Sequence, residues 1–295
     1  MEGWKGVTME HSEEELRGAN DVRLHLALHR PSNVSTPRAV VAVSHGFGEH
    51  GGRYSNLVEH IVPRGYAVYA LDHQGHGRSG GRRGHVGRWS EYLAGVGAML
   101  EAVRQREPGA PVFLFGHSLG GLIAAEYALA HPEGLAGLIL SSPVLGSVGV
   151  SPARRMLGRA LSGVWPTFSI HTGLDAGTIS RDPAAVRGYI ADPLVHDVTS
   201  ARLGSEMDLA VKRVQARAAE FALPLLLFHG TADRLTSPEA RRAFFARTTA
   251  PDREFVEYDG GYHETLNDLD HERVAADVLR WMEARLPRTD HCEER

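Results

Sequence analysis

Residues 112–121 read Val-Phe-Leu-Phe-Gly-His-Ser-Leu-Gly-Gly, and the rest of the chain is best understood outward from them. Four apolar residues, two of them aromatic, are typical of a short buried strand. A G-x-S-x-G turn follows at Gly116, Ser118 and Gly120, and residues 122–130 are rich in Ala and Leu, which predicts a helix. A strand, a tight glycine turn and a helix in this order make the serine a candidate nucleophile. The alternative is a glycine turn whose serine has no function.

The two glycines of this turn have a physical reason. A nucleophilic serine must sit on a strained turn so that its hydroxyl stands clear of the backbone. Glycines on either side remove Cβ atoms that would collide with the neighbouring strand and helix. The new helix also points its free N–H groups and the positive end of its dipole toward the hydroxyl of Ser118.

The composition is that of an ordinary globular protein. The 295 residues are 42% hydrophobic and 23% charged, with a formal net charge of -4, so nothing favours a nucleic-acid partner. The arginine pairs Arg82-Arg83 and Arg241-Arg242 are interpreted as solvated faces. The one cysteine, Cys292, excludes an internal disulfide. The sequence shows no secretory signal and no run of about 18 apolar residues, so we expect a cytoplasmic location, with peripheral membrane contact left open.

Apolar runs alternate with amphipathic segments along most of the chain, which predicts β-α-β units around a mostly parallel sheet flanked by helices. The expected strands are residues 22–28 at a sheet edge, 39–43, 66–71, 112–115, 137–140, 223–228 and 254–258. The expected helices are residues 56–62, 91–105, 122–130, 238–245 and 273–286. This alternation stops between residues 145 and 222, where Gly and Pro interrupt a weak helical periodicity. We expect a core of residues 20–144 and 223–287, a helical cap or lid at 145–222, and polar tails at 1–19 and 288–295.

A serine hydroxyl needs a base to take its proton, and the base needs an acceptor on its other nitrogen. Imidazole is the usual base because it titrates near neutral pH. In serine hydrolases with this turn, the acid and then the histidine follow the nucleophile along the chain. Asp233 comes just after the apolar run that ends at residue 228, and His263 follows the next run through a glycine-rich loop. Asp259, only four residues before His263, is the weaker candidate for the acid.

Acyl transfer also needs two donors for the oxyanion. The residue after the nucleophile, Leu119, supplies one backbone N–H, and the loop after the strand at residues 39–43 supplies the other at Phe47. Their apolar side chains are acceptable because only the backbone acts.

The segment at residues 75–80, Gly-His-Gly-Arg-Ser-Gly, matches the G-x-G-x-x-G pattern of dinucleotide sites. Further glycines prevent the helix that should follow, so we interpret it as a structural loop. Three histidines in the same region lack partners at metal-ligand spacing. We therefore expect neither a cofactor nor a metal ion.

Five segments together resemble the monoacylglycerol lipase / serine aminopeptidase-like (lysophospholipase-like) branch of the α/β-hydrolase superfamily. They are His45-Gly-Phe-Gly-Glu-His50 with Arg53-Tyr54, Asp72-His-Gln-Gly-His-Gly-Arg-Ser79, Gly116-His-Ser-Leu-Gly-Gly121, Asp192-Pro-Leu-Val-His196, and His263-Glu264 with Asn267. The resemblance implies an α/β-hydrolase fold with an inserted helical cap. It also implies a triad of Ser118, Asp233 and His263, with oxyanion donors at Phe47 and Leu119.

The activity implied by this resemblance is hydrolysis of single-chain lipid esters, above all of monoacylglycerol to glycerol and fatty acid, through an acyl-enzyme on Ser118. Alternatives are a lysophospholipase, a general short- or medium-chain carboxylesterase, a peptidase, or a non-catalytic ligand-binding protein on the same fold. The cap is the candidate surface for transient membrane or micelle contact. The apolar residues expected to line an acyl-chain tunnel are Leu161, Val164, Trp165, Phe168, Ile170, Leu174 and Ile179. The oligomeric state is left open.

Overall fold

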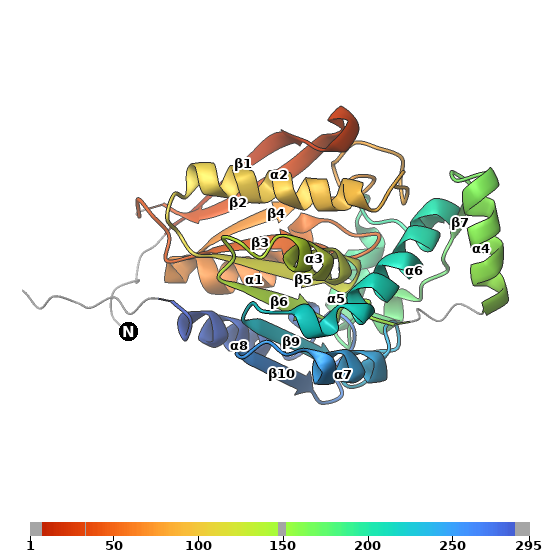
Figure 1. Ribbon diagram of the computed structural model, residues 1–295. Coiled ribbons are helices and arrows are strands. Elements are labelled where there is room, and N and C mark those ends of the chain that lie inside the picture. The colour runs from red at the N-terminus through yellow and green to blue at the C-terminus, as the bar shows by residue number, and fades with distance from the viewer. Residues whose placement is uncertain (1–7, 33, 147–151, 287–295) are drawn as a thin grey trace, which may run out of the picture.

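The computed structural model describes residues 8–32, 34–146 and 152–286, so Cys292 and the tail at residues 288–295 lie outside the described part. Eight strands form one sheet in the order β1-β2-β4-β3-β5-β6-β9-β10 (Figure 1). Their bounds are β1 Met9–Arg17, β2 Arg23–Pro31, β3 Val40–Ser44, β4 Ala67–Leu71, β5 Val112–His117, β6 Gly137–Ser141, β9 Leu225–Gly230 and β10 Arg253–Tyr258. The neighbouring strands β4, β3, β5, β6, β9 and β10 run parallel to one another. β1 and β2 run antiparallel to their neighbours. The prediction of a mostly parallel sheet is confirmed.

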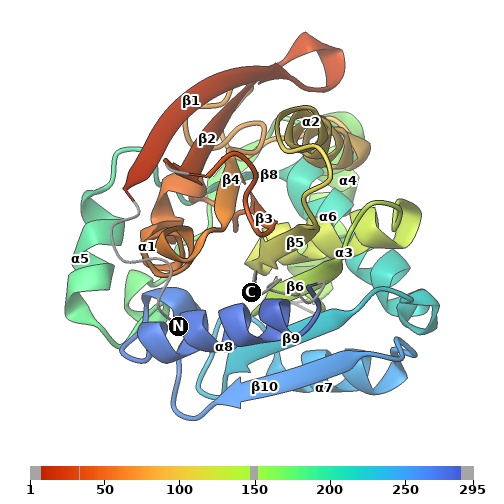
Figure 2. The ribbon, with the colours of Figure 1, turned by 90° about the vertical axis from the view of Figure 1, so that its left-hand side faces the viewer.

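Helices cover both faces of this sheet (Figure 2). α1 (Ser55–Ile61) and α8 (His271–Glu283) pack on one face, and α2 (Ser90–Arg106), α3 (Ser118–Ala130) and α7 (Pro238–Arg247) pack on the other. Successive side chains of a strand point to opposite faces, so a strand buried on both sides must be apolar throughout. On β5, Phe113 and Phe115 join one core and Leu114 joins the other, which explains the continuous apolar run before the turn.

The N-terminal region departs from the prediction. Residues 1–19 were expected to be a polar tail and residues 22–28 an edge strand, but β1 is the edge strand and β2 lies second in the sheet. Most residues of β1 are polar or charged and exposed, so they give no apolar alternation to recognise. Charged edge strands resist pairing with other chains. Glu15 of β1 forms an ion pair of 2.9 Å with Arg23 of β2, and Leu16 of β1 packs against the core.

Between β6 and β9 the chain leaves the sheet and forms a cap beyond the carboxyl ends of the parallel strands (Figure 1). Its helices are α4 (Pro152–Val164), α5 (Pro183–Ala191) and α6 (Ala201–Ala216). Its two short strands, β7 (Ser169–His171) and β8 (Val198–Ser200), pair antiparallel. Among the described helices, none is both long and apolar enough to cross a membrane.

The segment matching G-x-G-x-x-G is a loop, as predicted. The N–H of Gly75 donates to the carbonyl of Gly80 at 2.8 Å, and the N–H of Gly80 donates to the carbonyl of Arg23 on β2 at 2.7 Å. Gly75 and Gly77 have φ angles of 74° and 49°, a region that glycine adopts readily. The loop is therefore fastened to the sheet and opens no helix.

Candidate active site

Ser118 sits where β5 ends and α3 begins, and only 8% of it is exposed. Its φ angle is 52°, which is uncommon for a residue with a Cβ and is typical of strained functional positions. The turn tolerates no side chain on either flank. A Cβ on Gly120 would lie 2.0 Å from the carbonyl oxygen of Ser44, and a Cβ on Gly116 would lie 2.5 Å from the carbonyl oxygen of Gly120. The packing of helix against sheet thus explains the glycines of the motif.

The acid and base predicted from chain order lie together. The Nδ1 atom of His263, in the loop after β10, is 3.0 Å from Oδ2 of Asp233, in the loop after β9. Asp259, the competing acid, is exposed and accepts a hydrogen bond from the hydroxyl of Thr231 at 3.2 Å. The geometry therefore favours Asp233 as the partner of His263.

Asp233 is held as an anion by its surroundings. Burial alone would raise the pKa of its carboxyl group, but His263, Arg241 and Thr236 outweigh burial and hold that pKa well below its usual range. Its Oδ1 also accepts backbone N–H groups from Leu235 at 2.8 Å and Thr236 at 3.2 Å. A charged, oriented carboxylate is what an imidazole base needs on its Nδ1 side.

His117, the residue before Ser118, contacts His263 and so places Ser118 near the Asp233–His263 pair. The ring of His117 lies 4.8 Å from the ring of His263, centroid to centroid. Burial, with His263 adding to it, lowers the pKa of His117 to about 3, so His117 is uncharged at neutral pH. Among the hydrogen bonds of the described residues, none joins Ser118 to His263 directly. Such bonds are often long in structures without substrate.

The two predicted oxyanion donors belong to backbone segments next to Ser118. Leu119 is the second residue of α3, where backbone N–H groups have no partner within the helix. Phe47 follows β3 in a loop that lies close to Ser118, since a Cβ on the neighbouring Gly46 would lie 3.2 Å from Cβ of Ser118. Both backbone segments therefore lie next to Ser118.

Glu49 holds that loop in place, a role that the sequence motif did not reveal. Its carboxylate accepts the N–H of Gly46 at 2.5 Å, the hydroxyl of Tyr54 at 2.8 Å and Nε of Arg53 at 3.1 Å. Arg53 also pairs with Glu264, the residue after His263. Burial opposes the charge of Glu49, but the neighbouring positive and polar groups outweigh it and lower its pKa to about 2. One arginine thus connects the loop of Phe47 with the loop of His263.

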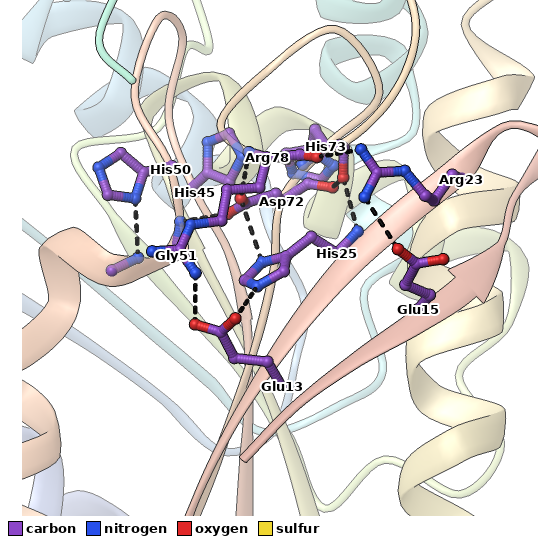
Figure 3. Close-up of polar contacts among 12 residues, drawn as sticks. Glu13, Glu15, Arg23, His25, His45, His50, Gly51, Asp72, His73 and Arg78 are labelled. Atoms are coloured by element: carbon purple, nitrogen blue, oxygen red, sulfur yellow. Dashed lines mark hydrogen bonds and ion pairs between the residues drawn. The ribbon is translucent and has the colours of Figure 1, made fainter. Parts of the chain in front are cut away.

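Asp72 plays a similar part at the end of β4 (Figure 3). It accepts the backbone N–H groups of Gly51 and Arg78, both at 2.8 Å, and lies 3.3 Å from Nδ1 of His25 on β2. Nε2 of His25 lies 3.4 Å from the carboxylate of Glu13 on β1. The carboxylate of Asp72 therefore fixes the loops that contain Gly51 and Arg78. Within the described residues, no group of three or more His, Cys, Asp or Glu could hold a metal ion.

A cavity of about 430 Å³ lies in the cap, lined by α4, α6 and the β7–β8 pair, and Val144 is its wall residue on the core side. Of the residues predicted to line a tunnel, Leu161, Phe168 and Ile170 do so. Val164 and Trp165 are instead mostly exposed, at 89% and 57%. Leu174 is absent from the lining of this cavity, and Ile179 is buried elsewhere, with its carbonyl accepting the N–H of Glu264 at 2.8 Å. Only part of the predicted lining is therefore correct, because helical periodicity in a glycine-broken segment does not show which face turns inward.

Comparisons with known proteins agree with this geometry. The family model described as serine aminopeptidase, S33, matches residues 35–270. A monoacylglycerol lipase of Mycolicibacterium smegmatis is 34% identical over 282 residues, which cover 95% of this chain and 100% of the relative. The crystal structure of a monoacylglycerol lipase from Paleococcus ferrophilus has a TM-score of 0.80 at 33% identity, covering 94% of this chain and 99% of that one. A phospholipase of Bacillus subtilis is 30% identical over 242 residues, 81% of this chain and 92% of the relative.

Both the family model and these relatives extend over most of the chain, and the fold and the glycine turn are those of the resemblance stated from the sequence. The chain therefore belongs to the serine aminopeptidase, S33, family of α/β-hydrolases.

Proposed function

We propose that this protein is a serine hydrolase that cleaves monoacylglycerols to glycerol and fatty acid. The observation that carries the proposal is the hydrogen-bonded Asp233–His263 pair beside the strained turn of Ser118, next to a cavity at the cap. The monoacylglycerol lipases among the relatives support the choice of substrate.

In this mechanism, Nε2 of His263 takes the proton of the Ser118 hydroxyl while Oγ attacks the ester carbonyl carbon. The negative oxygen of the tetrahedral intermediate is held by the N–H groups of Phe47 and Leu119. As the intermediate collapses, imidazolium gives its proton to the departing glycerol oxygen and the acyl group stays on Ser118. A water molecule then attacks the acyl-enzyme by the same route and releases the fatty acid. Asp233 holds the Nδ1–H of His263 throughout.

The cavity is suited to an acyl chain. Its volume of about 430 Å³ is within the range of small-molecule pockets, and side chains such as Leu161, Phe168 and Val211 line it. Val144 is part of its wall, and the N–H of Val144 donates to the carbonyl of Ser118 at 3.0 Å. The cavity wall is therefore joined to the turn of Ser118 through Val144, while the side chains of Ser118, Asp233 and His263 are not part of its lining. We assign the cap that holds it to residues 145–222, between a core segment that begins with β1 and ends at residue 144 and a second core segment that begins at residue 223.

We also propose that α4 meets a membrane or micelle surface. Met156, Leu157, Val164 and Trp165 are large apolar residues in or directly after this helix, and all four are mostly exposed. Exposed apolar clusters of this kind mark interaction sites, and amphipathic helices bind lipid interfaces with their apolar side. A lipid substrate would then enter the cavity from the surface that supplies it. A cytoplasmic location, peripheral to the membrane, fits this use.

A lysophospholipase is the second candidate function, and the similarity to the Bacillus subtilis phospholipase favours it. Parallel assays of monoacylglycerols, lysophospholipids, p-nitrophenyl esters and aminoacyl amides distinguish the candidates. We expect the highest kcat/KM for monoacylglycerols and none above background for the amides. A preference for lysophospholipids would select the second candidate, and a preference for aminoacyl amides would select a peptidase.

A further inference from the structure

A buried arginine lies against the acid of the proposed triad. Arg241, on α7, is 0% exposed, although its arginine pair was expected to be a solvated face. Its Nη1 is 3.1 Å from Oδ2 of Asp233 and also donates to the hydroxyl of Thr236. Its Nε and Nη2 find no hydrogen-bond partner among the described residues. Burying a guanidinium is costly, so if Arg241 only filled space an apolar residue would serve at least as well.

Arg241 is not needed to orient Asp233. Backbone N–H groups of Leu235 and Thr236 already bind Oδ1, and the Thr236 hydroxyl donates to Oδ2 at 2.7 Å. What Arg241 adds is a permanent positive charge on the same oxygen that accepts the hydrogen bond from His263. The guanidinium and the imidazole therefore share one carboxylate oxygen.

Among the described residues, Arg241 is the arginine that lies against this oxygen of Asp233. The other titratable groups that face Asp233, His263 or Arg241 are His229, His117, Glu239, Arg242 and Glu264. Burial, with Arg241 adding to it, lowers the pKa of His229 to about 3, so His229 is uncharged at neutral pH, as His117 is. Arg242 pairs with Glu257, and Glu264 pairs with Arg53. Glu239 accepts the hydroxyl of Ser237 at 2.9 Å.

We propose that Arg241 is a positioning residue that offsets the negative charge of Asp233 and so keeps His263 in its proton-accepting form in more acidic solution. A carboxylate next to an imidazole favours the protonated ring, which cannot take the proton of Ser118. A guanidinium on the same oxygen opposes that effect by Coulomb repulsion, which is strong in a buried site. The proposal rests on the proposed function, because it needs His263 to act as the base.

The test compares two substitutions of Arg241 with a matched control on the same helix. Arg241→Gln removes the charge and keeps a hydrogen-bond donor, Arg241→Lys keeps the charge, and Arg242→Gln removes an exposed neighbouring charge. The profile of kcat/KM against pH is measured for each with p-nitrophenyl butyrate. For Arg241→Gln, we expect the acid limb to move up by about one pH unit, with the alkaline plateau matching that of the control. For Arg241→Lys and Arg242→Gln, the acid limb of the pH profile should stay where it is in the unmodified protein.

A second measurement distinguishes an effect of Arg241 on the protonation of His263 from an effect on folding stability. The proton NMR signal of the His263 Nδ1–H, followed against pH, should shift with the kinetic limb in Arg241→Gln. An acid limb that does not move, or an equal loss of activity at all pH values, would overturn the proposal. So would failure of Arg241→Gln to fold while Arg241→Lys folds, because the charge would then serve stability. An unmodified protein that hydrolyses no ester would instead contradict the proposed function.

Discussion

Two carboxylates at the carboxyl ends of neighbouring strands differ in what they contact. Asp233 is buried and binds His263, whereas Asp259 is exposed and binds Thr231. We expect Asp233→Asn to lower kcat about 10⁴-fold, because an amide can stabilise the wrong tautomer of the imidazole. Asp259→Asn is the matched control and should stay within a few-fold of the unmodified enzyme. Steady-state kinetics on a soluble ester measures both, and the opposite ranking would assign the acid to Asp259.

Glu49 gives a prediction about stability and pH. Its pKa in the folded protein is about 2, below its ordinary value of 4.5. A carboxyl group whose pKa is lowered by folding stabilises the protein above its unfolded pKa, and this contribution is lost as the pH falls through the folded pKa. The free energy of unfolding of Glu49→Gln should therefore lie below that of the unmodified protein at pH 7. The difference should shrink between pH 4.5 and pH 2.

Urea unfolding at a series of pH values measures this difference. Glu59→Gln, on the exposed side of α1, is the control and should give little difference at any pH. A gap between Glu49→Gln and the unmodified protein that stays constant down to pH 2 would show that Glu49 acts through hydrogen bonds rather than through its charge.

Among the elements, α4 and the segment that follows it give the most direct test of lipid contact. Val164 and Trp165 are exposed large apolar residues that do not line the cavity. Replacing both by Ser should lower activity on monoacylglycerol presented in vesicles, because less apolar surface is available for the interface. Activity on a soluble short-chain ester should not change. Flotation with vesicles, alongside the two assays, measures binding directly.

Ile190→Ser on α5 is the control for that experiment, since Ile190 is also an exposed apolar residue of the cap. Equal losses for this variant and for the double variant would mean that general surface polarity matters rather than α4. Unchanged vesicle binding in the double variant would contradict the proposed orientation on the lipid surface.

For the molecule as a whole, the parallel part of the sheet was predictable because strands buried on both faces must be apolar throughout. β1 was not, because an exposed, charged edge strand lacks any apolar pattern. The Asp233–His263 pair was predictable because loops at the carboxyl ends of parallel strands meet at one edge. The burial of Arg241 was not, since a charged residue on an amphipathic helix predicts exposure, and only tertiary contact with Asp233 reverses it.

The measurement that bears most directly on the central claim is kcat/KM for monoacylglycerol hydrolysis by the unmodified protein and by Ser118→Ala. Because the three residues act as one unit, the substitution should cost on the scale of ~10⁶-fold, the loss that removing a triad serine causes in subtilisin. A fluorophosphonate probe should label the unmodified protein once, at Ser118. Monoacylglycerol hydrolysis that survives in Ser118→Ala, or labelling of a different serine, would contradict the account.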